Sequence, residues 1–225
     1  MQIRAEFITA LQDYLFLLEK NYPQKATLKL VSDKYRLNTQ ERSLLFRGVV
    51  VKKERNIRAG KTIKKLPDSG LVNIDGFNVL RTVASYMLGR PVFMAMDNFL
   101  RDASEMHGKP LKTKYRLQAF KLVIKVLQEK DLSSRFWFDA PVSFSGETVN
   151  EINEYFKSHN IEGRAETVRS ADNVLKQITE GVIATADSAI IENAKVPVID
   201  LSKLTLEHHF NPKFLNLMDF INFHD

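Results

Sequence analysis

The chain contains no cysteine among its 225 residues. Without a thiol it cannot form a disulfide, hold an iron–sulfur cluster, build a cysteine zinc site or use a thiol nucleophile. Any bound metal ion must therefore have oxygen or histidine ligands. Histidine is also scarce, at 5 residues, and the adjacent His208 and His209 would point in different directions on a helix or a strand. We interpret this pair as a surface feature and not as a pair of metal ligands.

Long apolar segments are absent as well. No window approaches the ~18 uninterrupted apolar residues of a membrane-spanning helix, and the first segment, MQIRAEFITALQDYLFLLEK, carries acids among its apolar residues. The sequence also lacks internal repeats and low-complexity segments. Because 44% of its residues are hydrophobic, the chain can build one substantial core, or a small domain attached to a medium one. We expect a folded, cytoplasmic protein that does not enter a membrane.

Positive charge is concentrated at the front of the chain. Residues 1–70 hold 15 lysines and arginines against 7 acids, whereas residues 71–225 hold 18 against 20, for a net charge of +6. This asymmetry favours a polyanionic partner, and nucleic acid before a membrane surface because the basic residues are spread over the whole segment. A solvated basic surface is the alternative interpretation.

Residues 1–65 are predicted to form a basic helical domain with a linker. Apolar residues at helical spacing predict a first helix that ends near Pro23, a second helix over 26–35, and a third from 39 to about 51, capped by Thr39. The second and third helices have the form of a DNA-binding helix-turn-helix, with Arg42 and Arg47 on the third. A helical hairpin that only packs is the alternative.

The most basic run, KKERNIRAGKTIKK at 52–65, lacks helical apolar spacing. We predict a linker or an arm that contacts a nucleic-acid backbone, with a solvated linker as the alternative. The candidate contact residues in this run are Lys52, Lys53, Arg55, Arg58, Lys61, Lys64 and Lys65.

Residues 66–225 alternate between short apolar runs and amphipathic segments. The predicted strands are LVNID, RFWFD, RAETV, GVIAT and VPVID. The predicted helices cover 114–129, 147–159, 172–180 and 188–194, and the final stretch, 201–225, is expected to pack as a helix. This alternation predicts an α/β domain with a mostly parallel sheet covered on both faces, preceded by the small helical domain.

Aspartates stand at the ends of these strands. Asp75 ends LVNID and Asp139 ends RFWFD, Asp172 follows RAETV, and Asp187 follows GVIAT. Taken singly, each has a structural explanation as a helix cap or a turn residue. Because parallel strands end at the same edge of a sheet, the four carboxylates are expected to lie together and repel one another unless a cation joins them. Oxygen ligands favour Mg²⁺ or Mn²⁺, and such a site suits phosphodiester hydrolysis.

Short motifs give the chain a resemblance to known proteins. IDGFNVL, FDAPVS, ADNVL and ATADSAII, in this order and spacing, resemble the successive motifs of the PIN-like nuclease superfamily, particularly its NYN branch. The whole chain is similar to an uncharacterised prokaryotic family with a basic helical front, through ATLKLVSDKYRL, FRGV and DNFLRD.

This resemblance implies a three-layer α/β/α domain with a Mg²⁺- or Mn²⁺-dependent nuclease site that usually acts on RNA. Asp75 matches the first aspartate of the superfamily's motifs, and Asn78 matches the asparagine that supports it. Asp139 and Asp172 match the middle acids, while Thr185 and Asp187 match the late threonine and aspartate.

Two positions depart from the pattern of the superfamily. Many relatives carry paired acids where this chain has Asp172 and Asn173, and a basic residue often follows the last aspartate, where Ser188 stands here. A site with one fewer negative charge is expected to hold one metal ion tightly and a second only with substrate bound. Weak or lost catalysis is the alternative.

The segment between the first two motifs adds further candidates. Lys114 and Lys121 lie on or near the face of a predicted helix opposite its apolar stripe, where they would contact a phosphate backbone or simply be solvated. Asp97, Arg101 and Asp102 form a polar cluster in a predicted loop beneath the sheet edge. The alternative for the last of these is a helix that starts at Asp102 and Glu105.

The sequence therefore predicts a metal-dependent nuclease that binds nucleic acid, with RNA preferred through the resemblance alone. A nucleic-acid-binding adaptor that has lost activity is the second hypothesis. A phosphatase that uses Asp75 as a covalent nucleophile ranks last, because position 77 is Phe where such enzymes commonly place a second aspartate. The oligomeric state stays open, with a homodimer as one option.

Overall fold

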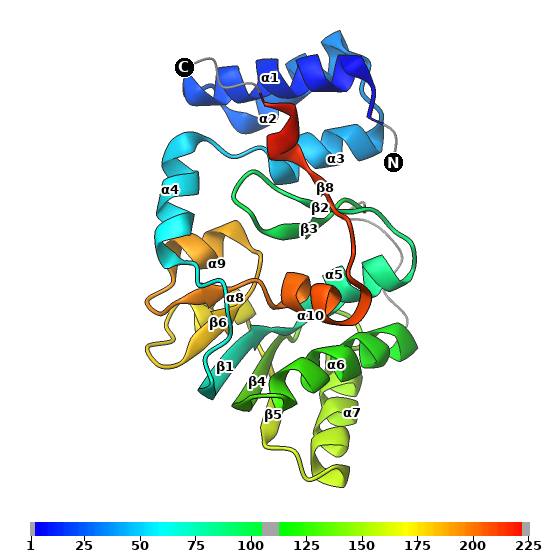
Figure 1. Cartoon of the computed structure of the whole chain (residues 1–225), viewed down its shortest axis with the longest axis vertical. Helices are drawn as coiled ribbons and strands as arrows, with labels where there is room; N and C mark the ends of the chain where they lie inside the picture. The colour runs from blue at the N-terminus through cyan, green and yellow to red at the C-terminus, as the bar shows by residue number, and fades with distance from the viewer. Residues whose placement is uncertain (1–2, 105–112, 222–225) are drawn as a thin grey trace.

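The computed structural model describes residues 3–104 and 113–221. Its first part is helical and lies at one end of the molecule (Figure 1). The four helices here are α1 (Ala5–Glu19), α2 (Gln24–Lys34), α3 (Thr39–Gly48) and α4 (Lys52–Lys61). Within the described ranges, no helix is long and apolar enough to cross a membrane.

Two predictions about this helical region are wrong. The cap of α3 is Asn38 and not Thr39, since the Asn38 side chain accepts a hydrogen bond from the Glu41 amide while the Glu41 carboxylate accepts one from the Asn38 amide. This reciprocal pair is a capping box. The run expected to be an irregular linker is helix α4. This helix has no apolar stripe. Its one buried side chain is Arg58, and ion pairs of that residue hold the helix in place of apolar contacts.

A five-stranded sheet forms the centre of the remaining chain, as predicted. It consists of β1 (Ser69–Asp75), β4 (Asp131–Asp139), β5 (Gly163–Val168), β6 (Val182–Ala184) and β7 (Val198–Ile199). All its pairings are parallel, and the order across the sheet is β5-β4-β1-β6-β7. Strand β1 is central, with Ile74 opposite Phe136 of β4 on one side and Ala184 of β6 on the other.

Helices cover both faces of this sheet, which confirms the predicted α/β class. One layer contains α5 (Gly76–Met87), α6 (Thr113–Gln128) and α10 (Leu201–Phe210), with α7 (Ser145–Ser158) beside β5, and the other contains α8 (Ala171–Leu175) and α9 (Ser188–Asn193). Successive residues of β1 face opposite layers. Ile74 packs in the core under α5 and α6, whereas Asn73 accepts a hydrogen bond from Trp137, which belongs to the core under α8 and α9.

A second, small sheet joins the two parts of the chain. Strand β2 (Val92–Met94) pairs antiparallel with β3 (Leu100–Asp102) and parallel with β8 (Leu215–Asn216), which leads into the 3₁₀ helix η1 (Leu217–Phe220). The predicted loop around Asp102 is therefore a strand, and Asp102 does not start a helix. Glu105 lies outside the described residues.

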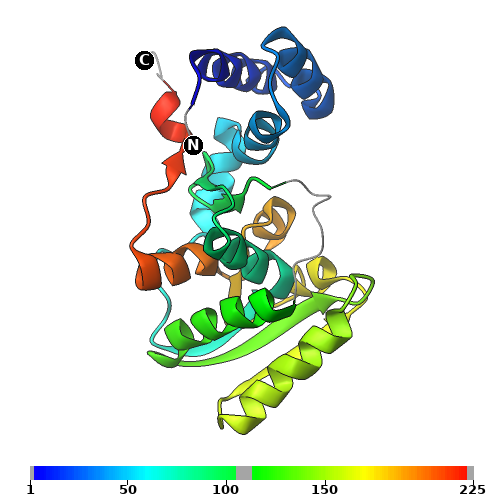
Figure 2. The same cartoon turned by 90° about the vertical axis from the view of Figure 1, so that its right-hand side faces the viewer.

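The C-terminal stretch is not one helix either. Helix α10 ends at Phe210, and Asn211 follows with a left-handed backbone. The chain then runs back along the molecule to β8 beside the helical region, as Figure 2 shows. The last residues of the predicted helix, 222–225, lie outside the described residues.

Helices α1 to α3 share a hydrophobic core with the small sheet. Leu11 and Leu44 pack in one cluster with Phe93 of β2 and with Leu217. The contact is tight at Gly48, where an added Cβ would lie 2.4 Å from atoms of both Phe93 and Leu217. Packing on two sides favours the alternative in which the helical hairpin only packs.

Candidate active site

The strand order of the main sheet reverses between β1 and β6. From β1 the chain adds β4 and β5 on one side, and then β6 and β7 on the other. Connections that leave the carboxyl ends of these two strands diverge, which is where open parallel sheets bind ligands. Asp75 ends β1 and Thr185 follows β6, so these two side chains flank the switch point.

The Asp75 carboxylate is buried and held from both sides. Its Oδ2 accepts a hydrogen bond from the Thr185 hydroxyl at 2.9 Å, and its Oδ1 accepts one from the Asn78 amide at 3.3 Å as the cap of α5. The side chain is therefore fixed at the start of α5. The next position, Gly76, has no room for a larger residue, because an added Cβ there would lie 2.4 Å from the Phe138 ring.

Asn78 supports this site differently from the expectation. Its backbone amide, and not its side chain, contacts Asp75. The side-chain Oδ1 instead accepts a hydrogen bond from the Ala186 amide at 2.9 Å. Asn78 therefore ties α5 to the connection between β6 and α9, which carries Asp187.

Thr185 and Asp187 are coupled in the same connection. The Thr185 oxygen accepts a hydrogen bond from the Asp187 amide at 3.0 Å, so the hydroxyl proton is left to donate to Asp75. Asp187 caps α9, and its Oδ1 accepts hydrogen bonds from the Ala189 and Ile190 amides. This cap uses one carboxylate oxygen, and Oδ2 has no hydrogen bond with the described residues.

Asp139 and Asp172 lie at the next two strands of the same edge. Asp139 ends β4, and its Oδ1 accepts a hydrogen bond from the Ala171 amide at 2.8 Å. Asp172 lies in the first turn of α8, which is capped by Ser170 and ends at Leu175, short of the predicted end at 180. Lys176 lies 3.8 Å from the Asp172 carboxylate on an exposed face.

The acids at this edge act on one another electrostatically. Burial, together with the charges of Asp187 and Asp172, raises the pKa of Asp75 to about 7, although the hydrogen bonds from Thr185 and Asn78 oppose the shift. Burial also raises the pKa of Asp172, as do the charges of Asp187 and Asp139. Asp75, Asp172 and Asp187 therefore lie within range of one another's charge, and Asp139 acts on Asp172. No lysine or arginine pairs with Asp75 in the described part of the chain.

The arrangement suits a metal ion that keeps most of its water. Across residues 3–104 and 113–221, no set of three or more acidic or histidine side chains converges closely enough to hold a metal by itself. Mg²⁺ does not require such a set, because it commonly binds through one or two carboxylates, waters and substrate phosphate. Asp75 and Asp187 fit that role, since each presents a carboxylate at the switch point.

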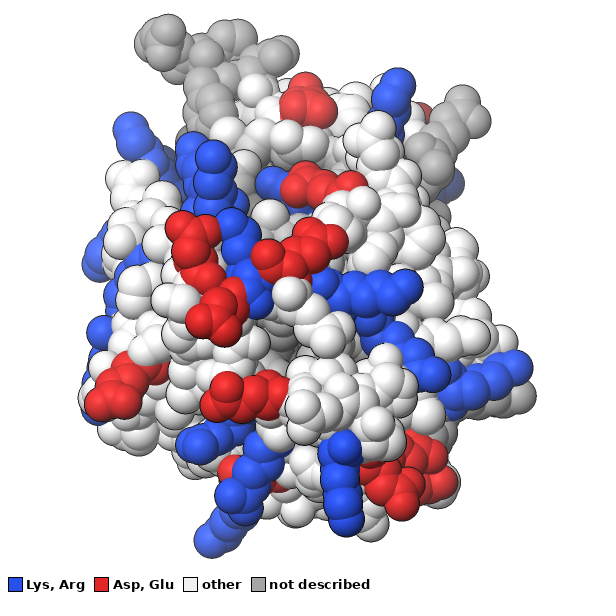
Figure 3. Space-filling view, turned by 60° about the horizontal axis from the view of Figure 1, so that its bottom comes forward, with Lys and Arg blue, Asp and Glu red and all other residues white. Residues whose placement is uncertain are grey.

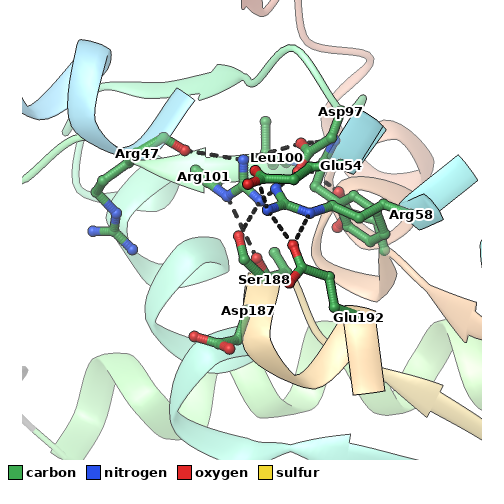
Figure 4. Close-up of polar contacts among 12 residues, drawn as sticks. Arg47, Glu54, Arg58, Asp97, Leu100, Arg101, Asp187, Ser188 and Glu192 are labelled. Atoms are coloured by element: carbon green, nitrogen blue, oxygen red, sulfur yellow. Dashed lines mark hydrogen bonds and ion pairs between the residues drawn. The ribbon is translucent and has the colours of Figure 1, made fainter. Parts of the chain in front are cut away.

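The predicted cluster of Asp97, Arg101 and Asp102 does not form a single group. Asp97 has a fully buried carboxylate that pairs with both Arg101 and Arg58 at 2.6 Å (Figure 4). Arg101 also donates to the Ser188 hydroxyl at 3.2 Å, so it reaches the residue that follows Asp187. Asp102 instead bonds to Ser85 and Ser104.

The residues proposed to contact nucleic acid fall into two groups. Arg58 is 4% exposed and Lys61 donates to the carbonyls of Glu192 and Ala194, so neither lies free on a basic surface. Arg42 pairs with Asp33, and Arg55 contacts Met218. The exposed members are Arg42, Lys52, Lys53, Lys64, Lys65, Lys114 and Lys121. On the face that Figure 3 shows, basic and acidic side chains are interspersed.

Two residues near the site were missed by sequence reasoning. Asp200 ends VPVID in the same way as Asp75 ends LVNID, and its carboxylate is likewise buried, where it accepts hydrogen bonds from the Leu100 and Lys203 amides. Arg81 lies on the face of α5 that carries Asn78. The strand-end pattern could have found Asp200, whereas Arg81 has no signal of its own in the sequence.

Comparisons with known proteins describe the chain in two segments. Residues 64–204 match the family described as a domain of unknown function (DUF5616), and residues 6–61 match the one described as a protein of unknown function (DUF434). An uncharacterized protein of Methanocaldococcus jannaschii is 31% identical over 202 residues, which cover 88% of this chain and 96% of that protein. No solved structure matches the chain significantly.

Proposed function

The chain belongs to the DUF5616 domain family, whose description assigns no activity. From the geometry of the site, we propose that the protein is a metal-dependent nuclease. The reaction is hydrolysis of phosphodiester bonds, with Mg²⁺ or Mn²⁺ as the cofactor. RNA is preferred over DNA through the resemblance to PIN-like nucleases. Fold alone does not carry this proposal, because layered parallel sheets host many activities.

One observation carries the proposal. Asp75 is a buried carboxylate at the topological switch point, its neighbours Asp187 and Asp172 are also acids, and no basic side chain among the described residues pairs with it. Burying a charged group without a counter-charge is costly, and a divalent cation removes that cost. A helix cap alone does not explain the acidic neighbours.

The chain's own residues would hold the metal ion and keep the carboxylates that bind it in place. Asp75 and Asp187 would hold the ion directly, with Asp139 and Asp172 contributing through water. When bound, the ion would neutralise the phosphate and generate hydroxide from water. The Thr185 hydroxyl keeps Asp75 in one orientation, and Asn78 keeps the Asp187 connection against α5. No side chain has to act as a nucleophile.

A second candidate function is an inactive adaptor that binds nucleic acid. It is favoured by Asn173 and Ser188, which replace an acid and a base of the related motifs. Asn173 is exposed, and the Ser188 hydroxyl is engaged by Arg101. An adaptor is expected to bind RNA without metal and to keep binding after Asp75→Asn, with affinity that falls steeply as salt rises.

A cleavage assay separates the two candidates. Purified full-length protein is incubated with labelled single-stranded RNA, structured RNA and DNA in Mn²⁺, Mg²⁺ or EDTA. The wild type is expected to cleave only when Mn²⁺ or Mg²⁺ is present. The cleavage rate is expected to fall at least about 100-fold in Asp75→Asn and Asp187→Asn. The matched control is Asp131→Asn, because Asp131 is an exposed aspartate at the opposite end of the sheet.

Metal binding gives a readout that does not depend on turnover. Mn²⁺ is expected to raise the melting temperature of the wild type and of Asp131→Asn but not of Asp75→Asn, since an ion that binds the folded state stabilises it. The nuclease proposal fails if the wild type cuts no substrate in either metal, or if Asp75→Asn cuts as well as the wild type.

A further inference from the structure

Arg47 projects from the helical region toward the proposed active site. It lies in the last turn of α3, and its carbonyl accepts a hydrogen bond from Arg101 at 2.9 Å, which fixes its backbone. Figure 4 shows its side chain leaving the buried network on the side toward which the Asp187 carboxylate also extends. The half-buried guanidinium has no hydrogen bond or ion pair with any described residue.

Arg81 approaches the same region from α5. It lies three residues after Asn78 and therefore on the same helix face. The Asn78 side chain bonds to the Ala186 amide, so this face is turned toward the connection that carries Asp187. Arg81 is exposed and, like Arg47, has no partner in the described part of the chain.

The Arg47 guanidinium lies within electrostatic range of both Arg81 and Asp187. Burial lowers the pKa of Arg47, and the charges of Arg101 and Arg81 lower it further, whereas those of Asp102 and Asp187 raise it. Arg47 and Arg81 are thus like charges within electrostatic range, and neither is neutralised by direct contact with a carboxylate of the described residues. An anion placed between them would relieve this repulsion.

A cavity lies beside Arg47, although Asp75, Asp187 and Arg81 are not among its lining residues. It has a volume of about 500 Å³ and lies between the helical region and the start of α9, with Tyr22 and Ser188 in its lining. Its two acids, Glu54 and Glu192, pair with Arg58. The volume falls within the range of small-ligand pockets, and the aromatic ring of Tyr22 is 56% exposed.

We infer that Arg47 and Arg81 form a phosphate-binding subsite beside Asp187, which holds a backbone phosphate of the bound strand next to the one that is cut. Each planar guanidinium can donate two hydrogen bonds to phosphate oxygens. The helical region therefore supplies part of the active site. This inference rests on the proposed function, because it assigns the substrate contacts of that same site.

The test is RNA binding measured apart from cleavage. Fluorescence anisotropy of a labelled single-stranded RNA oligonucleotide is recorded in EDTA over a series of salt concentrations, with full-length wild type, Arg47→Gln and Arg81→Gln. Each variant is expected to bind about tenfold more weakly and to lower the salt slope by about 0.7, the value for one phosphate contact on a single strand. The matched control is Arg90→Gln, an exposed arginine beyond the other end of α5, which is expected to bind like the wild type.

The melting temperature of each variant shows whether it is folded. A second control is Arg47→Lys, which keeps the positive charge and is expected to keep the salt slope of the wild type. Weaker binding by both glutamine variants, with Arg90→Gln unchanged, supports the subsite whether or not the wild type cuts RNA. Wild-type binding that Arg47→Gln and Arg81→Gln leave unaltered overturns the subsite, even if the wild type cuts. A wild type that does not bind RNA in EDTA overturns the subsite, whereas the nuclease proposal is decided separately by the cleavage assay with metal.

Discussion

Asp200 is a buried carboxyl group that stabilises the fold through backbone contacts. Its two oxygens accept hydrogen bonds from the Leu100 amide of β3 and the Lys203 amide of α10. Burial raises its pKa to about 6 in spite of these bonds. Because Asp200 follows β7 at the same edge as the proposed site, it shows that a strand-end aspartate can serve packing between layers.

The raised pKa of Asp200 predicts a pH dependence of stability. The folded state keeps the proton at pH values where the unfolded chain, with a pKa of about 3.9, has lost it. The free energy of unfolding of the wild type should therefore fall relative to that of Asp200→Asn between about pH 4 and pH 6, by about 2 kcal/mol. Urea unfolding of both proteins across this range measures the difference, and a constant difference would contradict the prediction.

Two glycines give opposite predictions for the same substitution. An added Cβ at Gly76 meets the Phe138 ring, whereas one at Gly60 in α4 meets no atom within 4 Å. Gly76→Ala should destabilise the protein by about 1–3 kcal/mol through overpacking, and Gly60→Ala should stabilise it by about 0.5–1 kcal/mol through helix propensity. Thermal unfolding of the two variants compares them directly. Equal effects would show that the Phe138 ring moves aside freely.

At the scale of elements, ion pairs attach α4 to the α/β region. Arg58 bonds to Asp97 in the loop between β2 and β3 and to Glu192 at the end of α9. The charges of Arg101 and Arg58 hold the pKa of Asp97 below its ordinary value although burial opposes them. This network replaces the apolar stripe that α4 lacks.

Removal of the central acid should break this attachment. Asp97→Ala leaves Arg58 and Arg101 without the carboxylate that they share, so the free energy of unfolding should drop by about 3–5 kcal/mol. Glu54→Ala is the matched control, because Glu54 is about half exposed and, among the described residues, forms an ion pair only with Arg58. It should cost less than about 1 kcal/mol. Urea unfolding measures both, and similar losses would mean that the buried pairing adds nothing.

At the scale of the whole molecule, the helical region is not independent. Its core contains Phe93, Met96 and Leu217 in addition to its own helices. Residues 1–63 expressed alone should therefore remain largely unfolded, because these partners are missing. Circular dichroism is expected to show weak helicity without a cooperative thermal transition, while the full-length chain melts cooperatively. A cooperative transition in the fragment would show that α1 to α3 suffice as a core.

The main sheet was predictable because each strand carries a local signal. LVNID, RFWFD and GVIAT are short apolar runs bounded by polar residues, and each forms a strand at the predicted place. The small sheet was not, because β2 and β3 have three residues each and β8 has two. Runs of two or three residues are too short to show a periodicity, and β8 exists through pairing with β2, which lies far earlier in the chain.

The amino-acid sequence by itself determined the α/β class and the position of Asp75, Asp139 and Asp187 at strand ends, since both follow from local patterning. The tertiary structure decided what surrounds each charge. Arg58, predicted to lie on a basic surface, is buried in ion pairs, while Arg47 lies in electrostatic range of Asp187 and has no hydrogen-bond or ion-pair partner among residues 3–104 and 113–221. The physical reason is that the environment of a charged side chain depends on contacts between segments distant in the sequence.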